Sequence, residues 1–275
     1  MNNEEEGPKV DRIELADPDV FTIFQIIKNT VARLKDKTSI ILWSSFLLLV
    51  LWGKKGDAEF IFPEKLRECL LPDLVWRDQL VSFIIGFILL VVIPCCIIKF
   101  RFKEPLSDYG LGWPKERRRL GLLAFGVTLA IALPLFWFGS FDAQMQKEYP
   151  LFGKEAISTW GPFIIYEVVY LLFFCAIEFI FRGYLLFGLY GIKDIEALRR
   201  AKGARGPLVF GLYAILIQML AYTMWHVYKP VPEAIGAVFW GVAVGAVALR
   251  VRSIWPIIFA HWLLNVFLDI ILWTR

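Results

Sequence analysis

The sequence predicts an all-α, polytopic membrane helix bundle of about seven transmembrane helices, with an additional surface helix near the amino terminus. Of the 275 residues, 58% are hydrophobic, and the mean hydropathy of +0.59 is too high for an ordinary soluble domain. The apolar residues form runs that approach the roughly 20 residues needed to cross a bilayer. Basic residues lie mainly in the loops between these runs. We therefore expect a multi-pass integral protein of the cell (inner) membrane.

The first predicted element is an amphipathic helix. Asp17-Pro18-Asp19 has the acidic cap and early proline of a helix start. Apolar residues then recur at helical spacing, with basic residues elsewhere on the helix: Phe24, Ile27, Val31 and Leu34. This pattern favours a helix at the membrane surface, and a soluble helix packed on the loops is the alternative. The acidic amino terminus lacks the basic region of a cleaved signal peptide.

Seven apolar segments follow, and each is an expected membrane span. They are Ser39–Trp52, Leu80–Ile98, Leu120–Phe138, Pro162–Tyr190, Pro207–Val227, Ala234–Leu249 and Ile254–Trp273. We divide the chain into a cytosolic segment with the amphipathic helix at 1–38, a variable transmembrane region at 39–160 and a carboxyl-terminal bundle at 161–275.

The loop charges predict an orientation. With the amino terminus inside, 20 Lys and Arg residues lie on the inner side and 9 on the outer side. The positive-inside rule therefore favours a cytoplasmic amino terminus.

Composition excludes several other classes of protein. The net charge is only +4, and no aromatic-interleaved basic patch indicates a nucleic-acid partner. The four cysteines form neither a CxxC metal motif nor a disulfide framework: Cys69, Cys95, Cys96 and Cys175.

The sixth segment contains small residues at four-residue spacing. Ala237, Gly241 and Gly245 form the pattern that lets two helices approach closely. We expect packing within the chain rather than dimerisation.

Two charges lie inside the fourth apolar segment. Glu178 and Arg182 are four residues apart, so they share one face of a helix and can form an ion pair. Charges at this depth are costly and usually face a bundle interior, where they serve function. A purely structural ion pair is the alternative.

Both histidines of the chain also lie in apolar segments. His226 follows Tyr222 by four residues, and Asn265 follows His261 by four residues. Burying each polar group separately would cost about 1–3 kcal/mol per unsatisfied group. We therefore expect one shared polar cavity between three helices.

These residues resemble the CAAX-protease and bacteriocin-processing (CPBP) family of intramembrane endopeptidases, which includes the type II prenyl-protein protease. Its pattern of EExxxR, FxxxH and HxxxN on successive spans is similar to Ile177-Glu178-x-x-x-Arg182, Tyr222-x-x-x-His226 and His261-x-x-x-Asn265. The resemblance covers about Pro162–Trp273.

The resemblance implies a set of catalytic roles. The family's first glutamate activates water, its arginine holds the site, and the histidines and asparagine bind water and the oxyanion. Arg182, His226, His261 and Asn265 match, but the first acid is Ile177 here. Either Glu178 serves as the base, or it only pairs with Arg182 in a non-catalytic relative.

Three further residues are candidates for substrate binding: Tyr222, Glu233 and Glu167. Glu233 is also a plausible helix cap, and Glu167 lies about 16 Å along the helix from Glu178. No HExxH motif is present, and we expect no metal cofactor. Zinc held by His226, His261 and Glu178 is the alternative.

Taken together, these features favour an intramembrane endopeptidase that acts on a membrane-anchored protein or peptide, with lipid as its other partner. The predicted cavity opens outward, because His226 lies near the outer end of its span. The alternatives are a catalytically inactive immunity or scaffold protein of the same fold, and a small transporter. No internal repeat supports the transporter.

Overall fold

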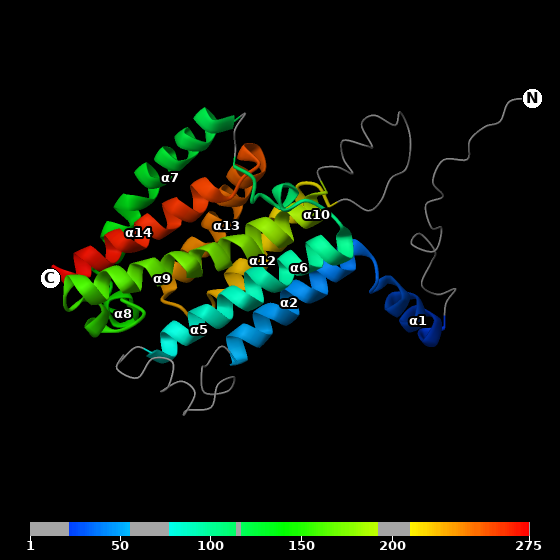
Figure 1. Ribbon diagram of the computed structural model, residues 1–275, viewed down its shortest axis with the longest axis horizontal. Helices are drawn as coiled ribbons and strands as arrows, with labels where there is room; N and C mark the ends of the chain where they lie inside the picture. Colours follow the sequence, from blue (N-terminus) through cyan, green and yellow to red (C-terminus); the bar gives the residue numbers. More distant parts are fainter. Residues whose placement is uncertain (1–21, 56–76, 114–116, 192–209, 275) are drawn as a thin grey trace, which may run out of the picture.

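The computed structural model describes residues 22–55, 77–113, 117–191 and 210–274, and these residues form helices and no strand. Figure 1 shows long helices lying side by side in one slab, with α7 at one edge and α2 at the other. The arrangement confirms the predicted all-α membrane bundle.

The helix bounds follow the predicted apolar segments. In chain order they are α1 (Ile23–Arg33), α2 (Lys37–Lys55), α5 (Arg77–Phe87), η3 (Ile88–Val92), α6 (Ile93–Cys96), η4 (Ile97–Phe102), η5 (Leu106–Tyr109), α7 (Arg118–Gly139), α8 (Ala143–Glu148), η7 (Lys154–Ile157), α9 (Trp160–Glu178), η8 (Phe179–Phe187), α10 (Gly188–Tyr190), α12 (Tyr213–Trp225), α13 (Val231–Val251) and α14 (Trp255–Trp273).

Five helical stretches within the described residues are long and apolar enough to cross a membrane: Gln79–Phe102, Arg118–Gly139, Trp160–Tyr190, Val231–Val251 and Trp255–Trp273. The other two predicted spans appear as shorter apolar helices, Lys37–Gly53 and Tyr213–Trp225. Part of the fifth predicted segment, residues 207–209, lies outside the described residues.

The amino-terminal helix α1 is amphipathic and has no buried residue. It begins after Thr22, whose side chain accepts from the Gln25 N–H while the Gln25 side chain accepts from the Thr22 N–H. This reciprocal cap satisfies backbone donors that the first turn leaves free. Ile23 and Phe24 are 78% and 74% exposed, which supports a surface helix. The predicted start at Asp17-Pro18-Asp19 lies outside the described residues.

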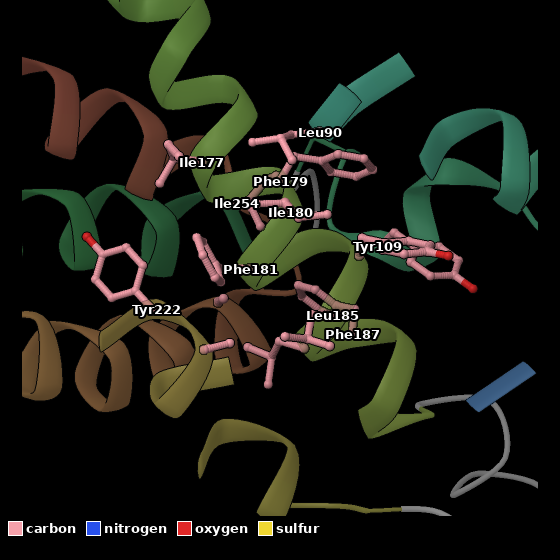
Figure 2. Packing of buried hydrophobic residues seen from close by; sticks show 14 of the residues in the cluster. Leu90, Tyr109, Ile177, Phe179, Ile180, Phe181, Leu185, Phe187, Tyr222 and Ile254 are labelled. Atoms are coloured by element: carbon pink, nitrogen blue, oxygen red, sulfur yellow. The ribbon is translucent and has the colours of Figure 1, made fainter. Parts of the chain in front are cut away.

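The centre of the bundle is the stretch α9–η8–α10, which runs without interruption from Trp160 to Tyr190. Its middle part, η8, is π-helical, and all nine of its residues are buried. Figure 2 shows its apolar side chains packed against residues of several other elements. π-Helical turns are rare and often occur at functional sites. Here the π-helix begins directly after Glu178.

The loop after η4 closes one end of this core. Gly110 has φ +79°, and a Cβ there would lie 2.8 Å from Phe187 and 2.9 Å from Ile254. Its carbonyl accepts from the Ile254 N–H at 3.0 Å. Glycine is therefore needed at position 110, where the loop approaches the core.

In the same loop, the Tyr109 hydroxyl donates to Glu104 at 2.6 Å, and burial together with this contact raises the pKa of Tyr109.

The small residues of α13 pack against α12, as predicted. A Cβ on Gly241 would lie 2.9 Å from the Met219 side chain and 3.0 Å from its Cα. One on Gly245 would lie 3.0 Å from the Gln218 amide nitrogen. The buried Gln218 amide donates to the carbonyl oxygen of Gly241. The glycines therefore bring the two helices into contact within one chain.

Candidate active site

The polar residues singled out from the sequence lie on three neighbouring parts of the bundle. Glu178 and Arg182 span the junction of α9 and η8, Tyr222 and His226 end α12, and His261 lies in α14. Helix α14 packs on α9, and α12 packs on η8. The tertiary structure thus brings together residues separated by more than 80 positions.

Glu178 and His261 make the central contact of the site. Nδ1 of His261 donates to Oε1 of Glu178 at 2.7 Å. The Glu178 side chain is fully buried, whereas the side chain of His261 retains 13% exposure. Because Nδ1 is used in this bond, Nε2 of His261 is the nitrogen with a free lone pair. Phe174 and Trp240 pack against the imidazole, at ring distances of 4.4 and 5.0 Å, and hold its orientation.

Arg182 balances the buried charge of Glu178. Its Nε lies 3.4 Å from Oε2 of Glu178, and both side chains are fully buried. The guanidinium carbon also lies 4.0 Å from the centre of the Tyr222 ring, in cation–π geometry. Leaving either charge of such a buried pair alone would be strongly destabilising. Arg182 therefore anchors Glu178 and links it to α12.

Ile177 stands at the position of the first family glutamate. It is 2% exposed and belongs to the main hydrophobic core cluster. Figure 2 draws it at the margin of that cluster. An aliphatic residue suits this surrounding, and Glu178 is the acid that contacts His261 and Arg182.

His226 lies at the end of the site formed by the carboxyl terminus of α12. Nδ1 of His226 donates to the Tyr222 carbonyl at 2.8 Å, and its ring lies 4.3 Å from the Tyr222 ring. Its Nε2 lies 3.7 Å from Oε1 of Glu233, at the start of α13. His226 is therefore joined to Arg182 through Tyr222, and the carboxylate nearest to its Nε2 in these contacts is that of Glu233.

Asn265 lies one turn beyond His261 on α14. Its Nδ2 donates to the His261 carbonyl at 3.0 Å, and its Oδ1 accepts from the Tyr170 hydroxyl at 3.3 Å. One amide hydrogen of Nδ2 remains available for another acceptor. Tyr170 was not singled out from the sequence, because a tyrosine in an apolar span does not by itself indicate a polar partner.

Glu167 is buried at 5% exposure, away from the Glu178–His261 contact. Its carbonyl accepts from the Trp262 indole at 3.0 Å, and its carboxylate has no hydrogen-bond partner among the described residues. Asp269, also fully buried, was missed by the sequence argument. The sequence did indicate a place for Asp269 beside the site: His261, Asn265 and Asp269 are spaced four residues apart and so share one helix face.

The carboxyl-terminal end of α12 is tied to the connection that precedes α9. Lys229 forms an ion pair with Glu148, at the end of α8. Tyr149, which follows, is buried, and burial raises the pKa of its hydroxyl. Lys229 lies three residues after His226, so this contact fixes the chain beside the site.

The zinc alternative requires three side chains to converge. Within the described ranges, no three His, Cys, Asp or Glu residues are grouped closely enough to hold a metal ion. Glu178 and His261 would fit as two ligands, but they already bind each other. His226 instead faces Glu233. In the described structure Glu178 and His261 form a hydrogen-bonded acid–imidazole pair.

Comparison with known families and proteins gives one match. Residues 159–267 match a family model described as "Type II CAAX prenyl endopeptidase Rce1-like". No curated protein and no solved structure matches the chain. The matched residues include all eight side chains that the sequence argument selected for the site.

Proposed function

We propose, from the premise that residues 159–267 belong to the CPBP family of intramembrane endopeptidases, that this chain hydrolyses a peptide bond near the membrane anchor of a protein substrate. The observation that carries the proposal is the buried contact between Glu178 and His261. A carboxylate that orients an imidazole leaves the second ring nitrogen able to act on water, as in other hydrolytic sites.

In the proposed reaction Glu178 activates water through His261, whose imidazole it orients and whose positive charge it stabilises. His261 is the more exposed partner, so water meets its Nε2 first. Nε2 takes a proton from the attacking water, and the Glu178 carboxylate stabilises the imidazolium that forms. The resulting hydroxide adds to the carbonyl carbon, and the tetrahedral intermediate then breaks its C–N bond. The proton held by the pair passes to the departing amine.

Arg182, Asn265 and His226 support this step. Arg182 offsets the negative charge of Glu178 inside the apolar bundle. The free amide hydrogen of Asn265 is a suitable donor to the developing oxyanion, and one such donor contributes about 10²–10³ in rate. His226, on a different helix, lines the same approach through its contact with Tyr222. Tyr222 and Glu233 would then contact the substrate chain.

The second candidate is a non-catalytic relative, which the isoleucine at position 177 favours. In that case the Glu178–Arg182 pair only fastens η8 to α9, and the protein acts by binding other membrane proteins. The buried position of Glu178 and its charge contact with Arg182 agree with this reading. The free Nε2 of His261 favours hydrolysis.

The test compares membrane-protein termini in cells that carry wild type, Glu178→Gln, His261→Ala or Glu155→Gln. Glu155→Gln is the matched control, because it makes the same chemical change in the η7 connection, outside the site. We expect cleavage products to be present with wild type and Glu155→Gln and lost with the other two. Purified protein must show comparable thermal midpoints, so that loss of fold is distinguished from loss of catalysis. Identical termini in all four strains would rule out proteolysis.

A further inference from the structure

An apolar groove lies between the start of α7 and the start of α14. Its volume is about 230 Å³. Most of its walls are apolar, and the residues that line it are Trp113, Arg118, Gly121, Leu122, Phe125, Pro256 and Phe259. Arg118 is the charged member of this set and lies at the first position of α7. The groove is thus an apolar surface that includes one cationic side chain among its lining residues.

The groove is separate from the candidate active site. Phe259 lines it and His261 lies two positions later, which places the two side chains about 200° apart around α14. A molecule in the groove therefore contacts the opposite face of α14 from the Glu178–His261 pair. Binding in the groove is therefore independent of the proposed hydrolysis.

The groove opens toward lipid rather than toward the bundle. Helix α7 lies at the edge of the slab in Figure 1 and has few buried residues. Leu122, in the groove wall, is 62% exposed. Trp113 is 59% exposed, and tryptophan is enriched where the hydrocarbon meets the headgroups. An exposed groove near the boundary between hydrocarbon and headgroups is accessible to lipid acyl chains.

Positive charge gathers at this end of the bundle. Arg117 and Arg119 flank Arg118, and α13 ends beside them, with the Arg250 carbonyl accepting from Nη1 of Arg117 at 2.5 Å. The first turn of α7 adds the partial positive charge of a helix amino terminus. By the distribution of loop charges this is the inner face, where the leaflet is anionic.

We propose that the groove binds an anionic phospholipid of the inner leaflet, with one acyl chain along its apolar wall and the phosphate on Arg118. The cavity is smaller than the roughly 300–1,000 Å³ of pockets that enclose whole drug-sized ligands, which fits one chain rather than a complete lipid. Basic pockets between helices on the cytoplasmic side recognise acidic headgroups in this way. Charge complementarity therefore selects this occupant over a zwitterionic lipid.

The experiment measures lipid retained by the purified full chain in native mass spectrometry, during titration with dioleoyl phosphatidylglycerol or dioleoyl phosphatidylcholine. The variants are Arg118→Gln and, as a matched control, Arg119→Gln. Both remove one positive charge from the same turn, but only Arg118 lines the groove. We expect wild type to prefer phosphatidylglycerol, Arg118→Gln to bind it about fivefold more weakly, and Arg119→Gln to stay within about twofold of wild type.

A second variant tests the apolar wall without changing charge. Phe259→Ala removes a large side chain from the groove and should weaken retention of both lipids, while thermal unfolding without lipid reports any loss of fold. Equal binding of the two lipids by wild type would overturn the proposal. So would equal effects of the two arginine substitutions, because general surface charge would then account for binding. If Phe259→Ala retained both lipids as well as wild type does, the acyl chain would not lie in the groove, and the proposal would be overturned.

Discussion

Glu178 and His261 are 83 positions apart in the sequence, and their side chains meet at 2.7 Å inside the bundle. The contact joins the end of α9 to α14, and it adds to two other hydrogen bonds between these helices, from Trp262 to the Glu167 carbonyl and from Tyr170 to Asn265. Because Glu178 also pairs with Arg182, one buried carboxylate serves two partners on different elements. The candidate chemistry and the packing of the central helix therefore depend on the same side chain.

Replacing Ile177 by glutamate should destabilise the protein rather than restore the family's paired acids at the site. Ile177 is buried in the apolar core, so a carboxylate there would be desolvated without a partner. We expect a loss of at least about 2 kcal/mol in unfolding free energy for Ile177→Glu, measured by denaturant unfolding in detergent. Ile177→Leu, which conserves volume, should cost less than about 1.5 kcal/mol. Equal stability of the two variants would mean that position 177 reaches a polar environment.

Glu233→Gln separates a role in substrate binding from a role in holding His226. Glu233 lies 3.7 Å from the Nε2 of His226 and is not fully buried. If it contacts substrate, the substitution should raise KM about tenfold with little change in kcat. Glu178→Gln should instead lower kcat by about 10²–10⁴. Steady-state kinetics on a cleaved substrate distinguishes the two, and a fall in kcat alone for Glu233→Gln would assign it to positioning His226.

The close approach of α12 and α13 can be tested with two glycines of the same helix. A Cβ on Gly241 would lie within 3.0 Å of Met219, whereas one on Gly236 meets nothing within 4 Å. Gly241→Ala should therefore destabilise the protein by about 1–3 kcal/mol through overpacking. Gly236→Ala should be neutral or slightly stabilising, because alanine favours helix. Thermal unfolding in detergent measures both, and a neutral Gly241→Ala would contradict the contact.

The predicted orientation can be measured by cysteine labelling. Tyr228 is 98% exposed just after the carboxyl-terminal end of α12, and Arg119 is exposed at the start of α7. In a variant without the natural cysteines, Tyr228→Cys should react with a membrane-impermeant maleimide in intact cells. Arg119→Cys should react only after permeabilisation. The reverse pattern would place the amino terminus outside and the approach to His226 inside. The neighbouring Lys229 is unsuitable for labelling, because its side chain forms an ion pair with Glu148.

Several local features of the site were predictable because helical spacing alone determines them. Residues four apart share a helix face, so the pairing of Glu178 with Arg182, of Tyr222 with His226 and of His261 with Asn265 followed from the sequence. The close packing of α13 through Gly241 and Gly245 followed in the same way.

Contacts between helices could not be predicted, because they depend on the rotation of each helix about its axis. The sequence did not show that His226 would face Glu233 while His261 faces Glu178, since both histidines lie in apolar segments with similar surroundings. It also gave no sign that a π-helical stretch begins after Glu178. Such a turn changes the angle between successive side chains, and only packing against neighbouring helices fixes it.

The amino-acid sequence by itself determined that this protein is a helical membrane bundle with an acid, an arginine, two imidazoles and a carboxamide on its carboxyl-terminal spans. Those conclusions needed only hydropathy and helical period, which are properties of one segment at a time. The tertiary structure alone decided that Glu178 contacts His261, that Ile177 belongs to the apolar core and that a groove opens beside Arg118. These are relationships between helices, and close packing of many side chains at once determines them.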